Sequence, residues 1–112
     1  MINTSDTTDF YCDFVFSKKI KVDIVKETEN LLAFHHTKKS FEIHIVIVPK
    51  EHIVKLTDLD DINLINEVFT IAQEIIREKN LDKTNFRIIT NGGSFQDSKH
   101  LHFHLVSGEK VN

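Results

Sequence analysis

The feature that most constrains the fold is a strict alternation of side chains in the run His100-Leu101-His102-Phe103-His104-Leu105. Successive side chains of a β-strand point to opposite faces of a sheet, so a strand here has imidazoles on one face and apolar groups on the other. The apolar face belongs to a core. The imidazole face needs polar partners, because a buried imidazole without a hydrogen bond costs roughly 1 to 3 kcal/mol.

The remaining segments supply the elements that such a strand requires. Patterns typical of strands occur at residues 20–25, 31–35, 43–48, 86–90 and 99–107. Residues 60–79 carry apolar side chains at helical spacing, with Thr57 and Asp60 resembling a capping box and Asn80 at the end. The order predicts an α+β fold, with an antiparallel sheet of about five strands and one long helix packed on it.

Composition restricts the class of protein. The 112 residues, 40% hydrophobic and 28% charged, fit one domain over 1–112, of which the polar residues 1–10 are expected to be poorly ordered. A net charge of −3 argues against a long nucleic acid as partner, and no apolar run approaches the ~20 residues that cross a membrane. The start lacks the regions of a signal peptide and there is one cysteine, so a cytoplasmic location is expected.

The row of histidines has three interpretations. The rings could face solvent on an edge strand. They could bind a metal together with a fourth group such as His44, His52 or Cys12, because imidazole is a common zinc ligand. They could also face an anionic ligand. Strict alternation beside an apolar face favours the third interpretation.

The run His-x-His-x-His followed by two apolar residues resembles the motif of the histidine triad (HIT) family, in particular its Hint-like branch of nucleotide hydrolases and transferases. Other landmarks of that family are matched in order by residues 32–35, by His44 leading through apolar residues into residues 49–52, and by residues 91–93 followed by Gln96. The resemblance covers about Val22 to Gly108 and implies a HIT-like fold, a nucleotide-like ligand and a homodimer.

The resemblance also implies catalytic roles. His102 would be the nucleophile that attacks the α-phosphorus and forms a covalent nucleotidyl-histidine, which water then opens. Its other ring nitrogen would donate to the main-chain carbonyl of His100, which fixes the tautomer. His104 and His44 would stabilise negative charge on the phosphate oxygens in the transition state.

Substrate-binding roles follow in the same way. Asn91 would bind near the scissile phosphate and Gln96 would lie toward the leaving group, while Phe34 and Phe14 would wall the base pocket. Each has a plainer interpretation, since asparagine is a common turn residue before Gly-Gly and phenylalanine is a common core residue.

Two further candidate substrate-binding residues depart from the family pattern. His36 stands where the family has an acidic residue that holds the ribose hydroxyls, and a neutral imidazole cannot accept bidentate hydrogen bonds as a carboxylate does. Asp97 stands where the Hint-like branch has serine, and it places negative charge near the leaving group. The loop from residue 91 to residue 100 is also shorter than in that branch.

A cofactor is not expected. In zinc-containing relatives the positions of His52 and His100 join two cysteines around a metal. Here Cys12 is the only cysteine, and Val15 stands where the second would be. We therefore predict no structural zinc.

The leading hypothesis is an enzyme that hydrolyses, or transfers the nucleotidyl group of, a nucleoside phosphoramidate or nucleoside polyphosphate through His102. A catalytically weak nucleotide-binding protein is the alternative that His36 and Asp97 favour. A metal-dependent hydrolase is the second alternative. Activity of His102 variants, ligand binding without turnover, and sensitivity to chelators distinguish the three.

Overall fold

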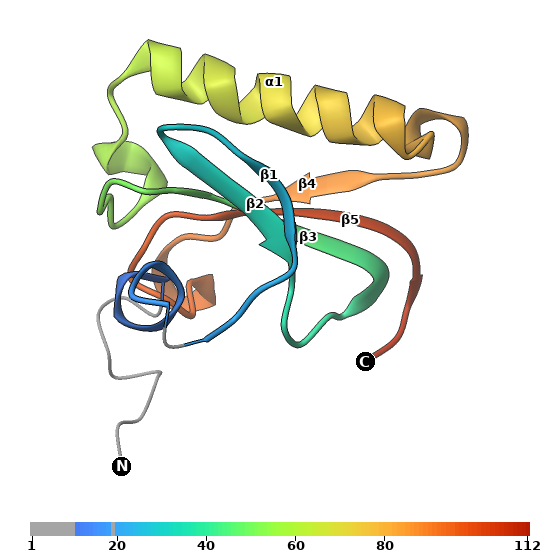
Figure 1. The fold of residues 1–112 in the computed structure, drawn as a ribbon, viewed down its shortest axis with the longest axis horizontal. Helices are drawn as coiled ribbons and strands as arrows, with labels where there is room; N and C mark the ends of the chain where they lie inside the picture. The colour runs from blue at the N-terminus through green and yellow to red at the C-terminus, as the bar shows by residue number, and fades with distance from the viewer. Residues whose placement is uncertain (1–10, 19) are drawn as a thin grey trace.

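The computed structural model describes residues 11–18 and 20–112 (Figure 1). Residues 1–10, for which poor order is predicted, and residue 19 lie outside this part, as does the side chain of Phe14. The described strands are β1 (Ile24–Glu27), β2 (Leu31–His35), β3 (Phe41–Pro49), β4 (Arg87–Ile89) and β5 (Phe103–Lys110). They form one antiparallel sheet in the order β1-β2-β3-β5-β4. A 17-residue helix, α1 (Ile62–Glu78), lies along one face of the sheet. The predicted α+β class is confirmed.

The main core lies between α1 and the sheet. The apolar stripe of the helix contacts side chains of β2, β3 and β5 together with Leu101, which is fully buried. Phe103 and Leu105 belong to the same core, with 4% and 0% of their surface exposed. The apolar half of the predicted alternation therefore faces the helix.

A second, smaller core covers part of the opposite face of the sheet. Short helical turns occur at Leu56–Asp58, Leu81–Lys83 and Gly93–Phe95, and a π-helical turn occupies Tyr11–Phe16. The π-helical turn packs on side chains of β2 and β3, and this second core consists of Tyr11, Val15, Leu32, Phe34, Val46 and Val48. Tyr11 and Val15 are each only 5% exposed. This turn lies outside the strands and the long helix expected from the sequence, and it places an aromatic ring beside the histidines.

The last strand begins later than predicted, at Phe103 instead of residue 99, and continues to Lys110. Its ladder with β3 ends at the pair Ile47 and Phe103. Continued in the same register, Val48 would face His102 and Pro49 would face Leu101, and Pro49 has no N–H to donate. The N–H of Leu101 bonds instead to the carbonyl of Ile53 at 2.6 Å. His100 and His102 therefore precede the strand, and only His104 lies within it.

The predicted capping box is wrong, whereas the predicted end of the helix is confirmed. The Asp61 carboxylate accepts hydrogen bonds from the N–H groups of Asn63 and Leu64 at 2.9 and 3.4 Å, so Asp61 is the N-cap. Thr57 belongs to the separate turn Leu56–Asp58. At the other end Asn80 takes a left-handed conformation with φ 57°.

Across residues 11–18 and 20–112, no helix combines the length and apolar character needed to cross a bilayer.

Candidate functional site

Four histidines from different elements gather on the face of the sheet opposite α1. His44 lies on β3, His104 on β5, His102 just before β5 and His36 just after β2. Ring centroids are 4.8 Å apart for His102 and His104, 5.0 Å for His44 and His104, and 4.4 Å for the stacked rings of His36 and His44. We refer to these residues as the imidazole cluster.

The His102 ring is held in one tautomer. Its Nδ1 lies 2.8 Å from the carbonyl oxygen of His100, which can only accept, so Nδ1–H donates. Nε2 of the neutral ring therefore carries the lone pair. Burial lowers the pKa of His102, opposed by the bond to the His100 carbonyl and by the charge of Asp97, so the ring is neutral at neutral pH.

A main-chain amide sets the tautomers of the next two rings. The N–H of Ser40 donates to Nδ1 of His44 at 2.9 Å, so neutral His44 carries its proton on Nε2. That Nε2 lies 2.8 Å from Nδ1 of His104 and donates to it. His104 consequently carries its own proton on Nε2. Both ring nitrogens of His44 are hydrogen-bonded within the protein, so the role of His44 is to orient His104. In this pair, the Nε2–H of His104 is the group that can donate to a ligand.

Electrostatics keep the cluster uncharged. Burial and then the neighbouring imidazoles lower the pKa of His104 to about 3, and burial and His36 lower the pKa of His44 to about 4. Rings this close to one another cannot all carry a positive charge in a partly buried site. At neutral pH the cluster therefore combines one nucleophilic lone pair, on His102, with an N–H donor on His104.

The tautomers can be tested directly. At pH 7 we expect His102 in the Nδ1–H form and both His44 and His104 in the Nε2–H form, because each has one nitrogen facing a partner of fixed polarity. Long-range proton–nitrogen correlation spectra of protein labelled with ¹⁵N-histidine distinguish the forms. A His102 ring protonated on Nε2 would contradict the assignment.

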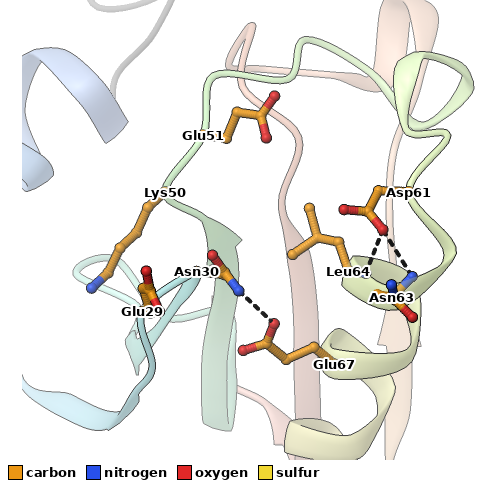
Figure 2. Close-up of a pocket in the computed structure, with 8 residues that line it drawn as sticks. All are labelled: Glu29, Asn30, Lys50, Glu51, Asp61, Asn63, Leu64 and Glu67. Carbon is orange, nitrogen blue, oxygen red and sulfur yellow. Dashed lines mark hydrogen bonds between the residues drawn. The ribbon is translucent and has the colours of Figure 1, made fainter.

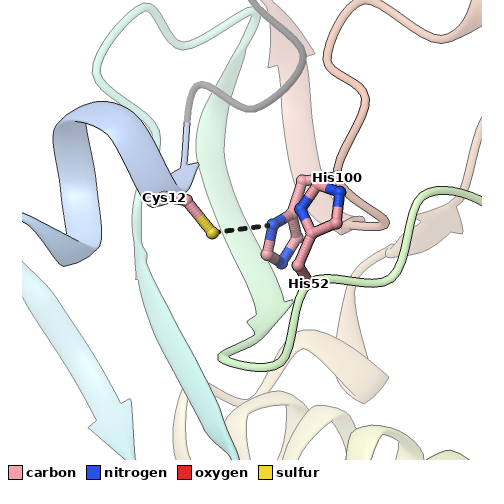
Figure 3. A group of neighbouring side chains, drawn as sticks. All are labelled: Cys12, His52 and His100. Carbon is pink, nitrogen blue, oxygen red and sulfur yellow. Dashed lines mark hydrogen bonds between the residues drawn. The ribbon is translucent and has the colours of Figure 1, made fainter.

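The side chain of His100, a predicted catalytic residue, belongs to a different group. Its ring is fully buried, with Nε2 2.6 Å from the carbonyl of Pro49 and Nδ1 3.7 Å from Sγ of Cys12 (Figure 3). His100 contacts the imidazole cluster through its main-chain carbonyl, which orients His102. The run of three histidines therefore serves two different sites.

Donor atoms of Cys12, His52 and His100 lie within 4.8 Å of one another. The bond from Nε2–H of His100 to Pro49 turns the Nδ1 lone pair toward Cys12, which suits a metal ligand. A closed structural zinc site takes four protein ligands, however, and buried Val15 brings an apolar side chain from the same turn. These residues fall one ligand short of a closed site, and the absence of structural zinc stays a prediction.

Of the two predicted aromatic walls, Phe34 and Phe14, the structure describes only the side chain of Phe34. Phe34 is 2% exposed and packs with its ring centroid 6.2 Å from Tyr11, as the core interpretation expects. The ring centroid of Tyr11 lies 5.0 Å from that of His102. Tyr11 is thus a neighbour of His102 that the motif does not reveal. Its signal in the sequence is the helical spacing of Tyr11, Phe14 and Val15.

The polar residues of the loop after β4 have different surroundings. The side-chain amide of Gln96 donates to the carbonyl of Val54 at 2.5 Å, so it anchors the loop. Asp97 is exposed, and its charge acts on His102 by raising the pKa of that ring. Asn91 is half-buried at the start of the loop.

A cavity of about 200 Å³ lies away from the imidazole cluster (Figure 2). It is lined by Glu29, Asn30, Lys50, Glu51, Asp61, Asn63, Leu64 and Glu67. Four of these side chains are carboxylates, which disfavour a phosphate by like-charge repulsion. A nucleotide site is better placed at the histidines.

Comparisons with known proteins agree with this geometry. The family model described as the HIT domain matches residues 17–111. An uncharacterised HIT-like protein of Rickettsia prowazekii is 32% identical over 102 residues, covering 87% of this chain and 85% of the relative. The solved histidine triad protein of Clostridium difficile aligns with a TM-score of 0.81 and 31% identity, covering 100% of this chain and 97% of its own. A HIT family hydrolase from Legionella pneumophila has a TM-score of 0.81 and 26% identity, with coverages of 93% and 96%. The chain belongs to the histidine triad family and has its fold.

Proposed function

We propose that this protein is a hydrolase or nucleotidyl transferase of the Hint-like type, acting on a nucleoside phosphoramidate or nucleoside polyphosphate. The observation that supports the proposal most strongly is the fixed tautomer of His102, whose Nδ1–H bonds to the carbonyl of His100 and leaves the Nε2 lone pair for phosphorus. The similarity to a HIT family hydrolase supports the same class of reaction.

The proposed reaction proceeds in two displacements. Nε2 of His102 forms a bond to the α-phosphorus while the bond from phosphorus to the leaving group breaks. The positive charge that develops on the His102 ring is stabilised by its hydrogen bond to the His100 carbonyl. His104 donates its Nε2–H to a phosphoryl oxygen, and His44 keeps His104 in the required orientation. Water then breaks the phosphorus–nitrogen bond and restores neutral His102.

The intermediate provides the decisive test. Intact-protein mass spectrometry after incubation with ATP, GTP and adenosine 5′-phosphoramidate, quenched at alkaline pH, should show the mass of one nucleoside monophosphate added to the chain. Peptide mapping should place it on His102. His102→Asn should carry no adduct, because an amide is not a nucleophile, although its N–H can still donate to the His100 carbonyl. Turnover without an adduct, or an adduct on another residue, would refute the mechanism.

The alternatives predict different results in binding and turnover experiments. A catalytically weak nucleotide-binding protein would bind adenosine monophosphate in calorimetry but show neither adduct nor turnover. A metal-dependent hydrolase would lose activity with a chelator and recover it with zinc, whereas turnover through His102 should not respond to the chelator. The homodimer and the cytoplasmic location stay predictions.

A further inference from the structure

His36 has a fixed tautomer that makes its outer nitrogen a hydrogen-bond donor. The main-chain N–H of Lys38 donates to Nδ1 of His36 at 2.9 Å, so the neutral ring carries its proton on Nε2. The main-chain N–H of His36 in turn donates to the carbonyl of His44 at 2.8 Å, which attaches the residue to β3. The ring is therefore held in place on both sides.

The position of His36 brings this donor close to the donor of His104. The rings of His36 and His44 are stacked at an interplanar angle of 28°, and the centroids of His36 and His104 are 5.9 Å apart. One nitrogen from each of His36, His44 and His104 lies within 4.8 Å of the others. Two N–H donors that share one acceptor oxygen can be up to about 5.4 to 6.4 Å apart, from two ordinary hydrogen-bond lengths. The 5.9 Å between the ring centroids of His36 and His104 falls in this range, which places the two rings close enough to donate to one phosphoryl group.

The same three rings are poorly suited to a metal ion. A neutral imidazole that binds a metal through Nε2 carries its proton on Nδ1. In His36 and His44 that proton would face the N–H of Lys38 and the N–H of Ser40, which would place two donors against each other. An anion requires no such change, because it accepts from the Nε2–H groups already present.

We propose that His36 is a second phosphate-binding donor, which acts with His104 on the phosphoryl group that His102 attacks. The inference depends on the proposed function for the identity of that group. A carboxylate in this place would accept hydrogen bonds from hydroxyl groups of a ligand, whereas His36 binds an anionic oxygen. The site therefore recognises its ligand at this point through phosphate and not through a diol.

The electrostatic surroundings of His36 fit this role. Burial lowers the pKa of His36 first, and the nearby His102 and Lys38 lower it further. The ring is consequently a neutral donor in the free protein. A bound phosphate favours positive charge on each of the rings that it contacts, namely those of His36, His102 and His104.

Equilibrium binding of ligands that are not turned over tests the inference. The ligands are adenosine monophosphate, inorganic phosphate and adenosine, titrated calorimetrically at pH 7.5 in a phosphate-free buffer. His36→Phe keeps an aromatic ring to stack on His44 but removes the donor, and should weaken both phosphate-containing ligands roughly tenfold, about 1.4 kcal/mol. Adenosine should bind unchanged. His36→Asp, which replaces a donor by a negatively charged acceptor, should weaken inorganic phosphate further.

Controls separate loss of the donor from loss of structure. His35→Phe changes the neighbouring imidazole and should leave all three affinities unchanged, while His36→Gln, which restores an N–H donor, should recover part of the loss. Unaltered phosphate binding in a folded His36→Phe protein would overturn the inference, as would an equal loss for adenosine. The result does not depend on the covalent step: absence of a His102 adduct would refute the proposed reaction and leave these affinities as measured.

Discussion

Replacing His102 by asparagine should reduce kcat for adenosine 5′-phosphoramidate by roughly 10³-fold or more, equivalent to at least about 4 kcal/mol of transition-state stabilisation. The large effect is expected because, in the proposed reaction, the side chain at this position forms the bond to phosphorus. His102 is 7% exposed and bonded to the His100 carbonyl, an interaction that asparagine can retain. Steady-state kinetics with purified protein measure the effect.

Matched variants make that result specific. His35→Asn removes a half-buried imidazole outside the cluster and should leave kcat within about twofold, because His35 has no role in the proposed reaction. Circular dichroism and the thermal midpoint check that His102→Asn is folded. A folded His102→Asn protein with wild-type turnover would exclude His102 as the nucleophile.

Acidification should strongly destabilise the protein between pH 7 and pH 5. The pKa of His44 is lowered to about 4 and that of His104 to about 3, whereas both groups titrate near 6.5 in an unfolded chain. The unfolded state therefore binds more protons below pH 6.5, and stability present above that pH is lost as the pH falls through this window. Each group should remove about 1.4 kcal/mol per pH unit, or about 2 kcal/mol by pH 5.

Urea unfolding at pH 7.5 and pH 5.0 measures this loss, which is a large part of the 5 to 15 kcal/mol typical of a domain. His104→Gln removes one of the two groups and should reduce the dependence on pH by about 1.4 kcal/mol per unit. Asp and Glu side chains contribute little in this window, because they titrate near pH 4 in unfolded chains. A free energy of unfolding that is the same at both pH values would show that protonation of the cluster does not lower the stability of the folded state.

Much of the fold could be predicted from periodicity because burial has a simple signature in sequence. Leu101, Phe103 and Leu105 alternate with the histidines and all face α1. The start of β5 could not be predicted in this way, because the alternation of side chains continues through residues 100–102 although the hydrogen-bonded ladder has ended. That boundary depends on the partner strand, where Pro49 cannot donate.

The chemistry of the site was only partly predictable. The bond between His102 and the His100 carbonyl is a contact within three residues of one chain segment, and the motif implies it. The tautomers of His36 and His44 depend on the N–H groups of Lys38 and Ser40, which any residue except proline would supply. Such main-chain donors leave no mark in the pattern of side chains, so the orientation of these rings requires a structure.

This dependence on the main chain has a consequence for how the site tolerates change. The direction of the hydrogen bonds from Ser40 through His44 to His104 originates in a peptide group, so side-chain substitution at position 40 does not reverse it. Proline is the exception, because it removes the only hydrogen at the head of the relay. The identity of residue 40 can therefore change while the imidazole cluster keeps the direction of its hydrogen bonds, as long as the main-chain N–H is present.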